Sequence, residues 1–131
     1  MKPLIPFVLV AASATAVAGT PVQILDAYAN AVGAAYQVSA QRGDEFYARK
    51  FGVSAKMDSC ATCHTGKPTQ AGEHVITGKP IKPLAPAANA DRFSDPAKVE
   101  KWFKRNCTEV VGRECSAGEK ADFIAFVSGG L

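Results

Sequence analysis

Apolar side chains recur along this chain at helical spacing, and the pattern predicts a small protein built mainly from helices. Residues 21–38 are predicted to form a first helix, with a break near Gly33. A second helix is expected from a cap at Ser39 to about Phe51. Three of its residues, at positions i, i+3 and i+4, share one face: Gly43, Phe46 and Tyr47. The chain from residue 21 to about residue 51 is therefore expected to be helical.

A third helix is expected in the stretch "SDPAKVEKWFKRNC", residues 94–107, with Ser94 or Asp95 as its cap. Four of its residues fall at i, i+3, i+4 and i+7 and form one stripe: Val99, Trp102, Phe103 and Asn106. This stripe is expected to face the core. On the outer side, Glu100 and Lys104 have the i, i+4 spacing of an ion pair.

The last helix is marked at both of its ends. Ser116 and Glu119 have the spacing of a capping box, and Gly129 is expected to stop the helix.

Residues 65–93, which precede the third helix, are rich in glycine and proline. That composition excludes a long helix or a central strand, so a long loop is predicted there. A loop of this length in a compact domain is usually functional or packed on something.

The first residues have the pattern of a secretory signal peptide. Lys2 supplies the positive charge, residues 4–12 are mostly apolar, and Ala16-Val17-Ala18 fits the small-x-small cleavage pattern. We therefore expect a signal peptide over 1–18, a single domain over 19–131 and export to a periplasm. An uncleaved N-terminal anchor is the alternative, although the apolar run is short for one.

Composition agrees with one small globular domain. The chain has 131 residues, of which 47% are hydrophobic and 21% are charged. Its formal net charge is +3, which is too small to argue for nucleic acid or a membrane surface as a partner. Export would place its four cysteines in an oxidising compartment, where spare thiols tend to pair.

The stretch "DSCATCHTGK" carries the strongest chemical signal. Cys60, Cys63 and His64 form C-x-x-C-H, the attachment signature of a c-type haem. In such a site the two thiols bond the porphyrin edge, and the histidine binds the iron. A redox-active dithiol would need a βαβ context, and a zinc site would need a second ligand pair of suitable spacing. The helical pattern favours haem over both.

The opposite side of the iron has no obvious ligand. The usual methionine is missing, because the chain has only Met1 and Met57 and neither follows His64. His74 is the other histidine, and it would make the protein an ordinary bis-histidine electron carrier. Its position in a loop soon after His64 also fits a solvated histidine. Lysines are normally protonated, and an ammonium group is no ligand.

Asn106 is the unusual residue of the apolar stripe. A buried amide needs a partner, since an unsatisfied one costs about 1–3 kcal/mol. From the pattern alone, Asn106 is either a helix cap or a group that binds something. Cys107 follows it directly, and its expected partner is Cys115, because Cys60 and Cys63 are used by the haem motif.

Several segments together resemble the sphaeroides haem protein family, a high-spin, oxygen-binding class of cytochrome c. They are "SCATCH", "TGKPIKPLAP", "DRFSDPAKVEKWFKRNC" and "GRECSAGEKADFIAF". The resemblance implies an all-α class I cytochrome c fold around one covalent haem c, with crossed N- and C-terminal helices. Gly43, Phe46 and Tyr47 meeting Phe126 would suit such a crossing.

The resemblance also implies a site and a set of partners. In that family an asparagine directly before a disulfide cysteine is the sixth iron ligand, and the pattern falls on Asn106, Cys107 and Cys115. It further implies binding of oxygen, nitric oxide and similar molecules. Electron exchange with a dihaem cytochrome c and a membrane cytochrome b is implied as well.

Three functions remain open from the sequence. The first is a haem protein with a displaceable asparagine ligand, and the second is the carrier with His74 as a permanent ligand. The third is a reductase of oxygen, hydroxylamine or peroxide, which needs distal acid–base groups that the sequence does not offer, so a dedicated enzyme is disfavoured. Three lysines of the loop are expected to border the haem edge as a docking rim or simply to be solvated: Lys67, Lys79 and Lys82.

Overall fold

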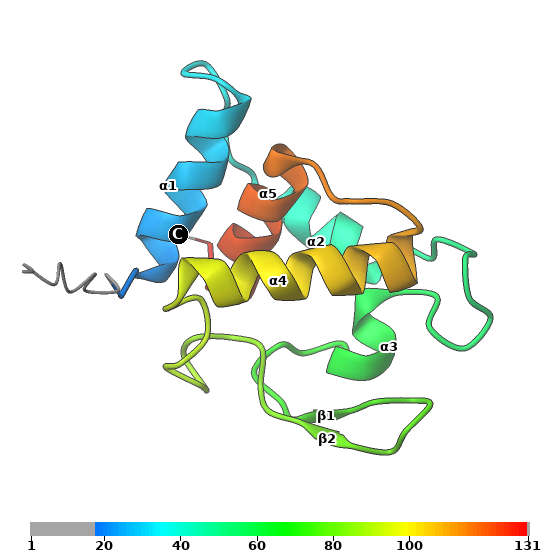
Figure 1. The fold of residues 1–131 in the computed structure, drawn as a ribbon. Helices are drawn as coiled ribbons and strands as arrows, with labels where there is room; N and C mark the ends of the chain where they lie inside the picture. The colour runs from blue at the N-terminus through cyan, green and yellow to red at the C-terminus, as the bar shows by residue number, and fades with distance from the viewer. Residues whose placement is uncertain (1–17, 131) are drawn as a thin grey trace, which may run out of the picture.

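The computed structural model describes residues 18–130. All of the predicted signal peptide except Ala18 lies outside the described part. The described chain folds as helices with one two-stranded ribbon, as the pattern predicted (Figure 1). The elements are α1 (Pro21–Val32), α2 (Ala40–Ala48), α3 (Cys60–His64), β1 (Gly72–Glu73), β2 (Pro80–Ile81), α4 (Pro96–Asn106), the π-helical turn η1 (Cys107–Val111) and α5 (Ala117–Val127). No helix within residues 18–130 is long and apolar enough to cross a membrane.

Helix α5 is the centre of the core. Ala121, Ile124 and Ala125 are fully buried, and both α1 and α2 pack against this helix. In the view of Figure 1, α4 runs between α5 above it and α3 with the β1–β2 ribbon below it. Helix α5 therefore holds α1 and α2 together, and α2 in turn contacts the haem-motif helix α3.

The crossing of α2 and α5 depends on a glycine. A Cβ atom placed on Gly43 would lie 2.0 Å from the carbonyl oxygen of Asp122 and 2.8 Å from the Cβ of Phe126. One turn further along α2, the ring of Tyr47 packs against Phe126 with centroids 5.3 Å apart. Gly43, Phe46 and Tyr47 are all buried, so the predicted shared face and its contact with Phe126 are confirmed.

A buried carboxylate fixes the same crossing electrostatically. Asp122 is buried on α5 and accepts from the Arg42 guanidinium, the Tyr36 hydroxyl and the Ser39 backbone N–H. The Arg42 Nε to Asp122 Oδ2 distance is 2.7 Å. Because the carboxylate has a charged partner and further donors, its burial costs little.

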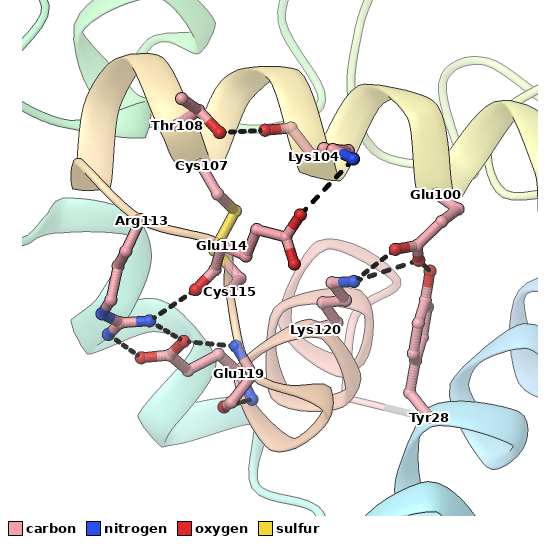
Figure 2. The surroundings of a disulfide bond; sticks show 11 residues. Tyr28, Glu100, Lys104, Cys107, Thr108, Arg113, Glu114, Cys115, Glu119 and Lys120 are labelled. Atoms are coloured by element: carbon pink, nitrogen blue, oxygen red, sulfur yellow. Dashed lines mark hydrogen bonds and ion pairs between the residues drawn. A yellow bond between two sulfur atoms is a disulfide. The ribbon is translucent and has the colours of Figure 1, made fainter.

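Helix α4 is joined to the core by an ion pair that the sequence did not predict. Glu100 pairs with Lys120 of α5, with a shortest Nζ to Oε distance of 2.8 Å, rather than with Lys104. Tyr28 of α1 donates its hydroxyl to the same carboxylate (Figure 2). Lys104 reaches Glu114 instead, at 3.6 Å. The i, i+4 prediction was wrong because Lys120 lies between the aromatic rings of Tyr28 and Phe103 and points toward Glu100.

The helix ends largely match the sequence pattern. Ser116 and Glu119 form the predicted capping box of α5, and Asp95, rather than Ser94, caps α4. The first helix ends at Val32, directly before Gly33, and does not resume. The second helix ends at Ala48, three residues short of the predicted Phe51, where the chain turns toward the haem motif. The 65–93 segment is mostly loop, as expected, with the ribbon as its short regular part.

We expect Gly43→Ala to destabilise the protein by about 2 kcal/mol or more, because the added methyl meets backbone that cannot move aside. Chemical denaturation of both proteins followed by circular dichroism measures the loss. Gly66→Ala is the matched control, since a Cβ at Gly66 has no neighbour within 4 Å. Equal stabilities of the two variants would contradict the role of Gly43.

Candidate haem site

The haem motif forms a helix of a single turn. In α3, Cys60, Cys63 and His64 lie at i, i+3 and i+4, so the three side chains share one face. The entry to the helix is fixed by hydroxyl contacts: the Ser59 and Thr62 hydroxyl oxygens are 2.9 Å apart, and Thr62 donates to Asp58. Two thiols and an imidazole are thereby presented together from one rigid turn.

The two thiols of the motif are unpaired. Cys60 and Cys63 are the free cysteines of the described chain, and both are half-buried. Burial raises the pKa of Cys60 to about 11, so this thiol stays protonated at neutral pH. Neither thiol is used in a disulfide, so both are available for thioether bonds.

His64 has the protonation state of an iron ligand. Burial, with the nearby positive charge of Arg92, lowers the pKa of its imidazole to about 4. The ring is neutral at neutral pH, and a neutral imidazole nitrogen is the form that binds a metal. The donor set of α3, two thiols and a neutral imidazole, thus fits a covalently attached haem.

Arg92 was missed by the sequence reasoning. Its guanidinium donates to the carbonyl oxygens of Pro83 and Lys82, at 2.9 and 2.8 Å, and this ties the loop together near His64. Leu84 and Ala85 donate their backbone N–H groups to the Pro68 carbonyl. The proline-rich loop is held by these bonds around the side of the motif that carries the histidine.

Strand β1 comes into backbone contact with α3. A Cβ atom on Gly72 would lie 2.0 Å from the carbonyl oxygen of Cys63 and 3.2 Å from the Cα of His64. Only a residue without a side chain allows this approach. The glycine content of the loop was visible in the sequence, but nothing in it singled out Gly72.

His74 is held as part of a turn. Its Nδ1 accepts the backbone N–H groups of Ile76 and Thr77, both at 3.2 Å. Its backbone N–H donates to Lys79 across the ribbon. The imidazole therefore caps the turn between β1 and β2 and is neither freely solvated nor free to rotate.

Protein atoms cover the apolar stripe of α4 along only part of its width. Val99 and Phe103 are buried and face the core, whereas Trp102 is 41% exposed and Asn106 is exposed. The stripe spans about 100° of the helix, so its two edges face different surroundings. Trp102 and Asn106, one turn apart on α4, are not covered by the protein core, which leaves both side chains accessible to a haem.

Asn106 stands at a change of helix type. It is the last residue of α4, and the next five residues form the π-helical turn η1. Gly112 closes that turn with φ of 83° and donates its backbone N–H to the Cys107 carbonyl. Single π-helical turns are rare and are often found at functional sites.

The structure pairs Cys107 with Cys115, whose Cα atoms are 5.7 Å apart (Figure 2). Both residues are buried. Arg113, in the loop that the disulfide closes, forms a bidentate ion pair with Glu119, the N3 residue of the capping box of α5. The bridge therefore connects the segment after Asn106 to the start of the central helix.

Comparisons with known proteins agree with these features. A family model described as "Domain of unknown function (DUF1924)" matches residues 33–127. The Cytochrome c-type protein SHP of Cereibacter sphaeroides is 46% identical over 110 residues, which is 83% of each chain. Cytochrome c'' of Methylophilus methylotrophus is 46% identical over 86 residues, 65% of this chain and 60% of that protein.

A solved structure has the same fold. The structure of oxidized SHP, described as an oxygen binding cytochrome c, superposes with a TM-score of 0.76 at 45% identity. The match covers 82% of this chain and 95% of the other.

We expect Cys115→Ser to lower the free energy of unfolding by about 2.5 kcal/mol, because the closed loop is short. It should also perturb the visible spectrum of the holoprotein, since the bridge adjoins Asn106. Mass mapping without reduction should recover the linked peptides. Wild-type protein treated with a thiol reductant is the control and should show the same loss. A loss of stability with an unchanged spectrum would show that the disulfide stabilises the fold without affecting the haem site.

Proposed function

This chain belongs to the family of the c-type cytochrome SHP, and from that premise we propose that it binds small diatomic molecules at a haem whose sixth ligand, Asn106, is displaceable. The family confirms two expectations from the sequence, the all-α class I cytochrome c fold and a covalently bound haem c. The protein is a monohaem c-type cytochrome. The identity of its ligands and partners belongs to the proposal.

The haem, when bound, supplies an iron that exchanges single electrons and binds diatomic molecules. Cys60 and Cys63 hold its edge through thioether bonds, and His64 is the permanent iron ligand. The neutral state of the His64 imidazole supports that role. The contact between Gly72 and Cys63 keeps α3 in place against the loop.

The position of Asn106 is the observation that carries the proposal. This asparagine is the last residue of α4, it is not covered by the protein core, and after it the backbone passes into a π-helical turn. A residue at a helix end moves without breaking the hydrogen bonds of the whole helix. Its amide oxygen is a weak neutral ligand, and its NH₂ group is a donor available to an incoming molecule once the oxygen has left.

His74 is a poorer candidate for the sixth position. Its Nδ1 accepts two backbone N–H groups, so the proton of the neutral ring sits on Nε2. Binding iron through Nε2 would move that proton to Nδ1 and break both hydrogen bonds. The bis-histidine carrier remains the alternative that the experiment below excludes or supports.

The proposed electron partners are a dihaem cytochrome c and a membrane cytochrome b, in a periplasm to which the signal pattern would direct the chain. Lys67, Lys79 and Lys82 are exposed, and none of them has an ion-pair partner within residues 18–130. We assign them to a docking rim for an acidic protein surface. A dedicated reductase, which would need distal acid–base groups, is the less favoured function.

Replacing Asn106 tests the proposed ligand. Asn106→Ala should give a five-coordinate or water-ligated haem that binds carbon monoxide faster after reduction, and Asn106→His should give a low-spin haem that binds it poorly. Optical and electron paramagnetic resonance spectra with stopped-flow binding measure both effects. Asn30→Ala, an exposed asparagine on α1, is the control and should change nothing. If Asn106→Ala matches wild type while His74→Ala changes spectrum and rate, the bis-histidine carrier is correct.

The docking rim predicts a salt dependence. Electron transfer from an acidic dihaem cytochrome c should slow as ionic strength rises, and Lys79→Gln and Lys82→Gln should each lower the rate at low salt. Lys101→Gln removes an equal charge from the outer face of α4 and should have a smaller effect. Transfer that does not depend on salt would instead favour apolar docking.

A further inference from the structure

The residue that follows the histidine of the motif has a strained backbone. Thr65, the C-cap of α3, has φ of 67° and ψ of 171°. This region of backbone space is used almost only by glycine, because a Cβ atom clashes there. A β-branched residue persists in it only where its surroundings hold it. The strain is therefore located directly beside His64.

A buried tyrosine holds this peptide from a different helix. The hydroxyl of Tyr47 on α2 donates to the carbonyl oxygen of Thr65 at 2.6 Å. Tyr47 is only 1% exposed, and its ring packs against Phe123 and Phe126 of α5. Burial raises the pKa of this phenol above its ordinary value, so the hydroxyl keeps its proton and remains a donor.

The other polar contacts of Thr65 are local. Its hydroxyl donates to the Lys67 carbonyl and accepts the Lys67 backbone N–H, at 3.0 and 3.1 Å. These bonds shape the turn that leaves α3, but they join neighbouring residues and move together with the chain. The bond from Tyr47 is different, because it joins the peptide to the rigid crossing of α2 and α5.

We propose that Tyr47 is a positioning residue for His64: its hydroxyl holds the Thr65 peptide in the strained conformation and thereby fixes the orientation of the histidine. This inference rests on the proposed role of His64 as an iron ligand. With Cys60 and Cys63 bonded to the haem edge, the freedom left in the motif lies at its last residues. The backbone at residues 64 and 65 then sets the plane of the imidazole.

The inference distinguishes Tyr47 from a purely structural tyrosine. Tyr28 offers a comparison, because it is half-buried and its hydroxyl also donates a hydrogen bond. That bond goes to the Glu100 carboxylate and not to the haem motif. Loss of either hydroxyl should lower stability. Only the loss of the Tyr47 hydroxyl should change the iron–histidine bond.

The experiment measures the iron–histidine stretching band by resonance Raman spectroscopy, directly after photolysis of the carbon monoxide complex of the reduced holoprotein. Tyr47→Phe should shift or broaden the band and change the carbon monoxide dissociation rate about two- to tenfold, the factor that one typical hydrogen bond represents. Tyr28→Phe should leave both at wild-type values.

Two further variants separate the strained backbone from simple packing. Tyr47→Phe combined with Thr65→Gly should restore the wild-type band, because glycine keeps the conformation at no steric cost. Tyr47→Phe combined with Thr65→Ala should not restore it, since alanine retains the Cβ clash. An unchanged band in Tyr47→Phe, or equal rescue by glycine and alanine, would overturn the inference. A wild-type protein with no iron–histidine band would overturn the proposed role of His64 instead.

Discussion

The contact between the backbone of α2 at Gly43 and the carbonyl group of Asp122 on α5 sets the geometry on which the haem motif depends. Because no side chain separates the two helices at Gly43, the ring of Tyr47, one turn further along α2, packs against Phe123 and Phe126. Its hydroxyl then reaches Thr65 at the end of α3. The Asp122 carboxylate, bound by Arg42, adds an ionic contact at the same crossing. Gly43 on α2 is thus linked to His64 through Tyr47 and Thr65.

The helix that carries Asn106 is fastened differently. Near its start, Glu100 is bound by Lys120 and Tyr28, and just beyond its end the bridge from Cys107 joins it to the start of α5. The pair is only partly buried, since the Lys120 side chain is 11% exposed and that of Glu100 is 53% exposed, so removing Glu100 would leave a mostly buried ammonium group without its ion-pair partner. The ammonium group of Lys120 also faces the rings of Tyr28 and Phe103, which offset part of its desolvation. The pair therefore links α4 to α5, and through Tyr28 to α1.

Local patterns and the family resemblance predicted most of the helices, whereas most of the long-range contacts had no signal in the sequence. Helical periodicity placed α4 and α5, the capping box of Ser116 and Glu119 was correct, and Gly43 was placed on the face that meets Phe126. A stripe in one helix does not reveal which neighbour each of its edges meets, so the sequence did not show that the protein core covers Val99 and Phe103 but not Trp102 and Asn106. Glu100 was assigned the wrong partner for the same reason, since Lys120 follows it by twenty residues. The approach of Gly72 to Cys63 and the bond from Tyr47 to Thr65 also have no local signal.

The two sides of the proposed iron site differ in how firmly the chain holds them. The side of His64 is fixed by backbone, through the close approach of Gly72, the strained Thr65 peptide and the buried hydroxyl of Tyr47. The side of Asn106 is the end of α4, where the backbone passes into the π-helical turn η1. The rigid surroundings of His64 suit its proposed role as the permanent ligand. The position of Asn106 at a helix end suits its proposed role as a displaceable ligand. The bridge at Cys107 ties the residue after Asn106 to the start of α5, so the proposed displacement of Asn106 would involve only a short segment.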